Sequence, residues 1–323
     1  MTVQRWFTSP AGIIISSVAA TMLWGSALPF IKLSYHHLHI GSNDLFAQWL
    51  FAGYRFVLAG LLLMVLARLL QRKRKGITPS RVPISALAVL ALLQTFLQYV
   101  FVYAALGQGS GMTMSIISGS VSLFQLLAVR WIMKTEQLSV RKWLGLLLGF
   151  GGIAVMGMAS DNQLHITFGL AELLMLLSAL SGGVGNVLAR REAAVEPVIS
   201  LTGRQMFWGG MGLVMIGCAS GNPFPFVWDG VGLLMLLYLS LLSAGAFALW
   251  NTVMKYNEVG RVSMYLFLTP PFGVILSAVW LDERASLWSL VALALVTASI
   301  VLVNRGGRAA PSTTGERSAH KQV

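Results

Sequence analysis

The sequence predicts an all-α membrane protein whose ten transmembrane helices form two inverted five-helix repeats. The first observation behind this prediction is composition: 56% of the 323 residues are hydrophobic and only 11% are charged, whereas soluble domains average about 25% charged residues. The apolar residues also come in long blocks, such as 11–30 and 144–159. Each block is close to the roughly 20 residues that cross the hydrocarbon layer of a bilayer.

Ten such blocks fit between short polar separators, including Gly41-Ser42-Asn43 and Gly221-Asn222-Pro223. The expected helices are 12–34, 45–70, 83–106, 112–133, 140–159, 167–189, 199–219, 229–254, 262–281 and 286–303. The first block runs on to Ile31. This is longer than the apolar core of a cleavable signal peptide, so we interpret the block as a permanent helix.

The distribution of basic residues is the second observation. Ten spans place 20 of the 23 Lys and Arg on one side of the membrane, together with both termini; the exceptions are Lys32, Arg55 and Arg284. Because Lys and Arg collect in cytoplasmic loops, the sequence predicts a multi-pass protein of a bacterial inner (plasma) membrane with both termini in the cytoplasm. The same sorting explains the net charge of +12 without a nucleic-acid partner.

An internal repeat is the third observation. At an offset of 147 residues, Glu136 and Ser139 align with Glu283 and Ser286, each pair joining the fourth to the fifth helix of its half. Five spans per repeat make the second copy enter from the opposite side, an architecture common in secondary transporters. The predicted organisation is a cytoplasmic N-terminus at 1–11, a first repeat at 12–159, an outer linker at 160–166, a second repeat at 167–303 and a disordered cytoplasmic tail at 304–323.

Several short motifs recur in a fixed order along the chain. They are Trp24-Gly25-Ser26, Lys32, Arg55-Phe56, Glu136-x-x-Ser139, Trp250-Asn251, Thr269-Pro270 and Glu283-x-x-Ser286. In this order and spacing, the chain resembles the EamA branch of the drug/metabolite transporter superfamily over residues 13–158 and 167–304. The resemblance implies two EamA repeats, with helices 1–4 and 6–9 around a central cavity and helices 5 and 10 at the periphery. Members of the family export amino acids, drugs and other metabolites.

The sequence departs from the family pattern at two places that would line the cavity. Ser122-Leu123 stand in helix 4 at the counterpart of Thr269-Pro270, and Ser181-Gly182-Gly183 replace the aromatic residue expected midway along helix 6. The resemblance therefore does not specify the substrate.

Polar side chains at membrane depth are costly and usually face a protein interior or a wet cavity. Ser115, Ser118, Ser122 and Gln125 follow one another at spacings of three, four and three residues, which puts them on one helical face. Gln94 and Gln98 lie one turn apart in helix 3. The substrate-binding candidates from this pattern are Gln94, Gln98, Ser118 and Ser122. The alternative is hydrogen bonding between helices without a substrate.

Aromatic side chains supply further candidates. Trp24, Trp250 and Tyr265 are suited to stacking against an organic substrate or to cation–π contact with an amine; the alternative is core packing or an interfacial aromatic belt. Asn251 either orients a polar group of the substrate or bridges helices 8 and 9.

Two ionisable residues lie inside expected helices. Arg55 is a candidate partner for a substrate carboxylate, with binding to helix-end carbonyls near the outer surface as the alternative. Glu172 is a candidate for proton exchange or for attracting a cation, and burial would raise its pKa toward a useful range. The alternative for Glu172 is a solvated carboxylate at the start of a helix.

The Pro270-Pro271 pair predicts a break in helix 9. A proline removes a backbone donor and clashes with the preceding turn, and carbonyls released in a membrane need water, a neighbour or a ligand. We therefore expect a gate or hinge at Pro270 and Pro271.

The sequence predicts a secondary transporter that works by alternating access between the inverted repeats, and not an enzyme. Its expected substrate is a small amphipathic metabolite: an amino acid, an amine or a drug-like solute. The resemblance favours export. A lipid-handling or sensory membrane protein is the alternative, followed by an intramembrane enzyme. The positions of the histidines argue against an intramembrane enzyme, because all of them fall in expected loops or the tail. The sequence also has no phosphate-binding loop motif, so ATP-driven pumping by this chain is unsupported. We expect no cofactor and no metal; the expected partners are a solute and the bilayer, while protons and a homodimer partner are left open.

Overall fold

The computed structural model describes residues 3–41, 43–72, 80–106, 117–134, 139–158, 169–222, 225–280 and 287–305. Within these ranges every regular element is a helix, which confirms the predicted all-α fold. In chain order they are α1 (Val3–Thr8), α2 (Pro10–His37), α3 (Leu45–Arg72), α4 (Ile84–Ala91), η1 (Leu92–Leu97), α5 (Gln98–Leu106), α7 (Val121–Ala128), η2 (Val129–Met133), α8 (Val140–Met158), α9 (Leu170–Glu192), α10 (Val198–Gly217), η3 (Cys218–Ser220), α11 (Gly230–Tyr256), α12 (Val259–Val262), η4 (Ser263–Leu268), α13 (Thr269–Trp280) and α14 (Leu287–Arg305).

Five helical segments in the described part of the chain are long and apolar enough to cross a membrane. They are Pro10–His37, Leu45–Arg72, Ile84–Leu106, Leu170–Glu192 and Gly230–Tyr256. Shorter apolar helices occur at Val121–Met133 and Ala294–Val303. The expected total of ten spans stays a prediction.

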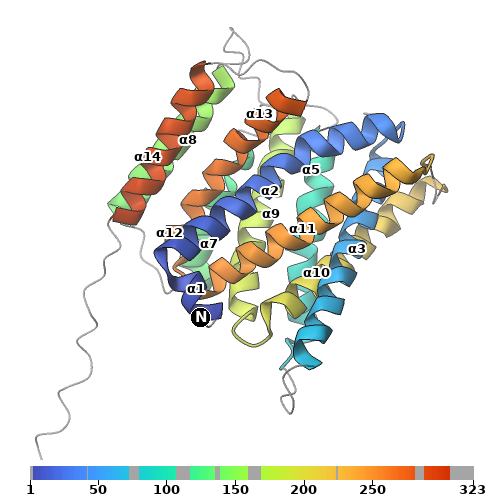
Figure 1. Ribbon diagram of the computed structural model, residues 1–323, viewed down its shortest axis with the longest axis horizontal. Helices are drawn as coiled ribbons and strands as arrows, with labels where there is room; N and C mark the ends of the chain where they lie inside the picture. The colour runs from blue at the N-terminus through green and yellow to red at the C-terminus, as the bar shows by residue number, and fades with distance from the viewer. Residues whose placement is uncertain are drawn as a thin grey trace, which may run out of the picture.

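The packing of the helices has the same pattern in the two halves of the chain (Figure 1). When the two halves are compared helix by helix, α2 of the first half corresponds to α9 of the second, α5 corresponds to α11, and α7 corresponds to α13. Accordingly, α2 packs against α11 and α13, and α9 packs against α5 and α7. Equivalent helices pair with each other in α3 with α10 and α8 with α14. This two-fold pattern is the packing expected of a duplicated unit.

Helices α8 and α14 lie side by side at one edge of the molecule (Figure 1). This is the peripheral position that the family resemblance implies for the fifth and tenth helices. The remaining helices surround the interior in which the candidate site residues are found.

Glycines bring α3 and α10 into close antiparallel contact. A Cβ atom added at Gly60 would lie 2.5 Å from the backbone N of Phe207 and 2.7 Å from the carbonyl O of Gly203. One added at Gly210 would lie 2.7 Å from the backbone N of Val57. Residue numbers rise along α3 as they fall along α10, so the helices run in opposite directions. Small residues permit such close approach between membrane helices.

The N-terminal boundary differs from the sequence prediction. Residues 3–8 of the expected segment 1–11 form α1, and α2 begins at Pro10. The Ser9 hydroxyl accepts a hydrogen bond from the backbone N–H of Gly12 at 3.1 Å. Serine at the cap and proline at the first helical position favour a helix start, but hydropathy measures only where the apolar span begins.

Other boundaries also shift. α2 continues to His37, so His36 and His37 belong to its last turn instead of the expected outer loop. Residues 304 and 305 of the expected disordered tail belong to α14. The expected outer linker 160–166 and residues 306–323 lie outside the described residues.

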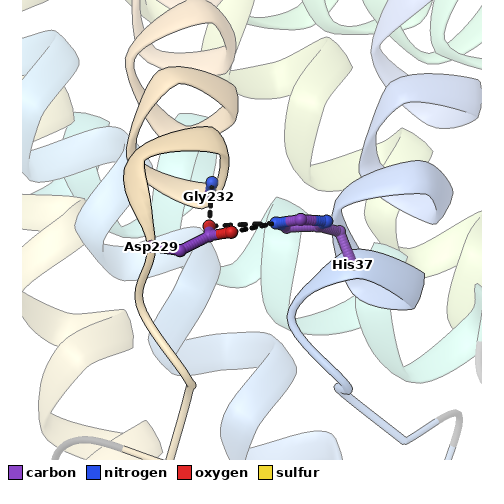
Figure 2. A network of polar contacts seen from close by, with 3 residues as sticks. All are labelled: His37, Asp229 and Gly232. Atoms are coloured by element: carbon purple, nitrogen blue, oxygen red, sulfur yellow. Dashed lines mark hydrogen bonds and ion pairs between the residues drawn. The ribbon is translucent and has the colours of Figure 1, made fainter.

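A hydrogen-bonded pair joins the last turn of α2 to the start of α11 (Figure 2). The Nε2 atom of His37 lies 2.9 Å from Oδ1 and 3.0 Å from Oδ2 of Asp229. The same carboxylate caps α11 by accepting the backbone N–H of Gly232 at 2.7 Å. The Gly232 hydrogen bond, followed by the one to His37, lowers the pKa of Asp229 below its ordinary value. This contact connects helices from the two halves of the chain.

We expect acid to weaken this contact. Because the pKa of Asp229 is lowered in the folded protein, its stabilising effect is present above the ordinary aspartate pKa. It is lost as the pH falls through the lowered folded value. Asp229→Asn keeps a capping oxygen but not the charge. Melting temperatures in detergent from about pH 7 to about pH 3 should show wild type above the variant at neutral pH, with the difference narrowing at the acid end of the range. A gap of constant size across that range would contradict the prediction.

Candidate functional site

A chain of buried amide side chains crosses the interior of the bundle. Gln94 in η1 donates from Nε2 to Oδ1 of Asn186 at 2.8 Å and to Oδ1 of Asn251 at 3.2 Å. Asn186 on α9 donates in turn to Oε1 of Gln125 on α7 at 2.8 Å. These four side chains are at most 5% exposed. Buried amides are costly unless they are hydrogen-bonded, so the chain holds its helices in one arrangement.

The amide chain extends at both ends. Gln125 donates to the Ser263 hydroxyl at 2.6 Å, and Ser122 donates to the Ser263 carbonyl at 2.9 Å. At the other end, Asn251 donates to the Thr202 hydroxyl at 3.0 Å. The chain therefore joins η1 and α7 of the first half to α9, α10, α11 and η4 of the second. The sequence-predicted residues that it brings together are Gln94, Ser122 and Asn251.

Glycines on α9 make the space that these amides occupy. A Cβ atom at Gly182 would lie 2.8 Å from the amide carbon of Gln98, and one at Gly185 would lie 2.8 Å from Cβ of Gln94. Gly183, between them, faces the backbone of α7 at a similar distance. An aromatic residue at this level of the helix would displace the glutamines. Glycine at 182 and 185 therefore leaves room for the polar side chains of Gln98 and Gln94.

The directions of the hydrogen bonds leave one acceptor without a donor. Asn186 and Asn251 each use their N–H groups elsewhere and present oxygen to Gln94, so Gln94 must turn its N–H₂ toward them. Its Oε1 is buried and lacks a hydrogen-bond partner within the described residues, as does Oε1 of Gln98. A buried unsatisfied group costs about 1–3 kcal/mol. Such groups mark positions where water or a ligand binds.

Two tryptophans pack beside the amide chain. The ring of Trp24 lies 5.8 Å from that of Trp250 and 5.3 Å from that of Phe247, both in edge-on geometry. Trp250 is completely buried, and its indole N–H lacks a hydrogen-bond acceptor in the described part of the chain. Tyr265 in η4 is 5% exposed and belongs to the same apolar cluster as Trp250. The structure thus groups the three predicted aromatic residues in one interior region.

Arg55 lies on α3 with 1% of its surface exposed. Its Nε donates to the Ser243 hydroxyl at 2.6 Å, and its Nη1 donates to the Tyr103 hydroxyl at 3.5 Å. The guanidinium carbon is 5.1 Å from the centre of the Phe56 ring. These contacts differ from the alternative of an arginine bonded to helix-end carbonyls. Among the described residues, no carboxylate forms an ion pair with Arg55.

Two helices beside the interior depart from α-helical geometry. The π-helical segment η1 carries Gln94 and Thr95 in the middle of the third helix, and π segments occur frequently at functional sites. The 3-10 segment η4 ends at Leu268, and α13 begins at Thr269, with Pro270 and Pro271 in its first turn. Because these prolines have no N–H to offer the preceding turn, the predicted break occurs there as a change to 3-10 geometry.

Two other predicted residues lie near the starts of helices. Glu172 is half-buried at the start of α9, and its carboxylate accepts the backbone N–H of Gly169 at 2.8 Å. This is the helix-capping alternative, and a role in proton coupling stays a prediction. Ser118 is half-buried in the helical turn at 117–118, before α7. Ser115 lies outside the described residues.

The sequence reasoning missed four residues that the structure places in the site. Asn186 is the central member of the amide chain, while Tyr35, Tyr103 and Ser243 surround Arg55. Asn186 is a polar residue deep in an apolar helix, so the rule that selected Gln94 also applies to it. The two tyrosines and Ser243 carry no comparable signal, because only the packing of α2, α5 and α11 brings them to Arg55.

Comparison with known proteins agrees with this architecture. A chain in a solved crystal structure superposes with a TM-score of 0.74 at 20% identity, covering 93% of this chain and 99% of its own, which shows a shared fold. The uncharacterized transporter YvbV of Bacillus subtilis is 30% identical over 80% of this chain and 83% of its own length. A "probable amino-acid metabolite efflux pump" of Salmonella typhimurium is 23% identical over 88% of this chain and 92% of its own.

Residues 11–158 and 169–305 each match the EamA-like transporter family, so both halves of the chain carry the family pattern. The two matches coincide with the two sets of helices related by the packing pattern. The two matches together cover nearly the whole chain. The chain is therefore a membrane protein of the EamA-like transporter family.

Proposed function

We propose that this protein is a secondary transporter that exports a small amphipathic metabolite by alternating access between its two inverted repeats. The observation that carries the proposal is the polar interior between the repeats. It contains buried hydrogen-bonding groups that lack protein partners within the described residues. Membership of the EamA-like transporter family provides the context.

The hydrogen bonds across the interior are suited to alternate opening. Ser122 and Gln125 of the first repeat hold Ser263 of the second, and Gln94 holds Asn251. Rocking of the repeats would exchange these bonds for bonds to water or substrate, so each state keeps its polar groups satisfied. On the predicted orientation, the His37–Asp229 pair lies at the outer end of the bundle. It would close that end when the site opens inward.

The substrate class and direction rest on similarity. The printed name of the Salmonella relative assigns it amino-acid metabolite efflux, and a relative of the same name occurs in Escherichia coli. The aromatic and amide groups near Trp24 and Gln94 suit a solute with both apolar and polar parts. We place the protein in the inner membrane with both termini cytoplasmic, and we leave proton coupling and a homodimer as open arrangements.

Counterflow in liposomes tests this proposal. Purified protein is reconstituted and assayed for exchange of labelled amino acids, amines and nucleosides, with and without an inward pH gradient. Saturable exchange of one class is the expected result, and a response to the gradient would add proton coupling. Folded protein that exchanges none of these solutes would refute the proposal.

Removing the break at Pro270 and Pro271 is expected to slow transport without weakening binding. Alanine at both positions supplies the missing N–H groups to the preceding turn, so η4 and α13 can form one straight helix. A helix-interior proline costs about 3 kcal/mol, enough to shift the balance between two states by tenfold or more. The counterflow rate should fall on the order of tenfold, with the half-saturating concentration unchanged. Pro10→Ala is the matched control because Pro10 is exposed at a helix start. An unchanged rate would contradict a hinge here.

One surface feature favours the lipid-handling alternative. An apolar pocket of about 480 Å³ lies between α4, η1 and α10, and its lining includes Leu92, Phe96 and Trp208. An acyl chain fits such a lining. If the solute panel fails with folded protein, exchange of labelled phospholipid between vesicles is the assay that distinguishes this function.

A further inference from the structure

We propose that the transported solute carries a carboxylate, which binds between the Arg55 guanidinium and the hydroxyl groups of Tyr35 and Tyr103. This inference deepens the proposed function and rests on it, because it names the chemical class bound in the transport site. It selects carboxylate-bearing solutes over amines that lack a carboxylate.

Within the described residues, the charge of Arg55 has no acidic counterpart. The side chain is 1% exposed and lies ten residues into α3, about 15 Å along the helix axis from its first residue. Its hydrogen-bond partners, Ser243 and Tyr103, are both neutral hydroxyls. Holding an unpaired ion away from water costs several kcal/mol. A carboxylate entering with the substrate would remove that cost.

Another arginine in the same chain shows how a structural partner is provided. Arg204 is also largely buried, and its Nη1 lies 2.7 Å from Oε2 of Glu196, whose side chain is 1% exposed. The same carboxylate accepts the backbone N–H of Val82 at 3.2 Å. Arg204 therefore meets a carboxylate of the protein itself. Arg55 lacks one among the described residues, and a bidentate carboxylate matches the donors of a guanidinium fork.

The hydroxyl groups around Arg55 come from both repeats. Tyr35 lies on α2, Tyr103 on α5 and Ser243 on α11. Ser243 donates its proton to the Leu239 carbonyl at 2.8 Å, so its oxygen is held ready to accept from Arg55. The ring of Tyr35 is 6.3 Å from that of Tyr103, and its buried hydroxyl faces the Tyr103 hydroxyl. Rotation of that hydroxyl away from Tyr103 would present its proton to a second carboxylate oxygen.

The apolar part of the solute has a matching surface beside this position. Phe247 lies one helical turn from Ser243 on α11. Its ring is 6.4 Å from Phe56, next to Arg55, and 5.3 Å from Trp24. Aromatic rings therefore run without interruption from the guanidinium to the tryptophan pair. This arrangement suits a carboxylate attached to a flat or branched apolar body.

The test compares matched probes in the counterflow assay. L-phenylalanine and 3-phenylpropionate carry the carboxylate, while phenethylamine and phenylalaninamide carry the same ring without it. We expect wild type to exchange one or both carboxylates and neither of the other probes. Arg55→Gln should reduce carboxylate exchange at least about tenfold. Arg55→Lys should retain part of it, since lysine keeps the charge without the fork. Arg68→Gln, an exposed arginine on the same helix, is the matched control and should match wild type.

Tyr35→Phe keeps the test decisive if Arg55→Gln does not fold. It removes one hydroxyl oxygen and should raise the half-saturating concentration of the carboxylate probe about threefold or more, with the melting temperature unchanged. Exchange of the amines by wild type at the carboxylate rate would overturn the inference while leaving the transporter function intact. So would unchanged carboxylate exchange by a folded Arg55→Gln. Absence of exchange for every probe and for the wider panel would overturn both.

Discussion

Replacing Gly60 with valine is expected to prevent assembly of the bundle. Any Cβ atom at this position would lie 2.5 Å from the Phe207 nitrogen and 2.7 Å from the Gly203 oxygen, and both of these are backbone atoms. Backbone cannot rotate away as a side chain can, so α3 and α10 must separate along their contact. Overpacking of this kind costs about 3 kcal/mol or more. The measurement is the yield of monodisperse protein in mild detergent, with its melting temperature.

Gly151→Val provides the matched control for this substitution. Gly151 also lies inside a helix, α8, but a Cβ atom there would meet no heavy atom within 4 Å. The same change in residue type should therefore leave folding close to wild type. Folded, stable Gly60→Val protein would show that the close approach of α3 and α10 is not required.

Replacing Asn186 with leucine is expected to impair transport by removing its hydrogen bonds while keeping a side chain of similar branched shape. Leucine has the same number of side-chain heavy atoms as asparagine and branches at the same carbon, but it offers no hydrogen bonds. Gln125 would lose the donor to its Oε1, whereas Gln94 would keep its bond to Asn251. The unfolding free energy should fall by about 1–3 kcal/mol for the acceptor left unpaired. Counterflow should fall on the order of tenfold or more if the amide chain sets the position of α7 and α9.

A double-mutant cycle separates this effect from simple loss of packing. Gln125→Leu removes the other side of the same hydrogen bond. If the two residues act through it, the combined variant should be less destabilised than the sum of the single variants. Additive losses, or wild-type transport by Asn186→Leu, would show that the bond has no part in the mechanism.

Several features of the fold follow directly from sequence pattern. Apolar blocks of membrane-spanning length identify the helices because the bilayer imposes a length and forbids unsatisfied backbone. The prolines at 270 and 271 identify a helix break for a local reason, the missing N–H. The Ser9 cap and helix α1 were missed because hydropathy reports the apolar span and not the capping residue.

The candidate site was only partly predictable for a different reason. Gln94, Asn251 and Ser122 could be selected because polar side chains in hydrocarbon need a partner or a cavity. Which partner each one finds depends on helix rotation and register, which hydropathy leaves undetermined. Glu172 is another residue whose partner hydropathy did not specify, because its carboxylate accepts the backbone N–H of Gly169 at the start of α9.

By itself, the sequence determined that this chain is an all-helical membrane protein built from a duplicated unit. Its apolar composition indicates the membrane, and the spacing of its recurring motifs indicates the duplication. The tertiary structure decided which helices meet across the duplication. It placed Asn186 between two glutamines and surrounded Arg55 with hydroxyls from three other helices. These contacts join residues far apart in the chain, and the pairing depends on close glycine-mediated packing that acts only once the helices are assembled.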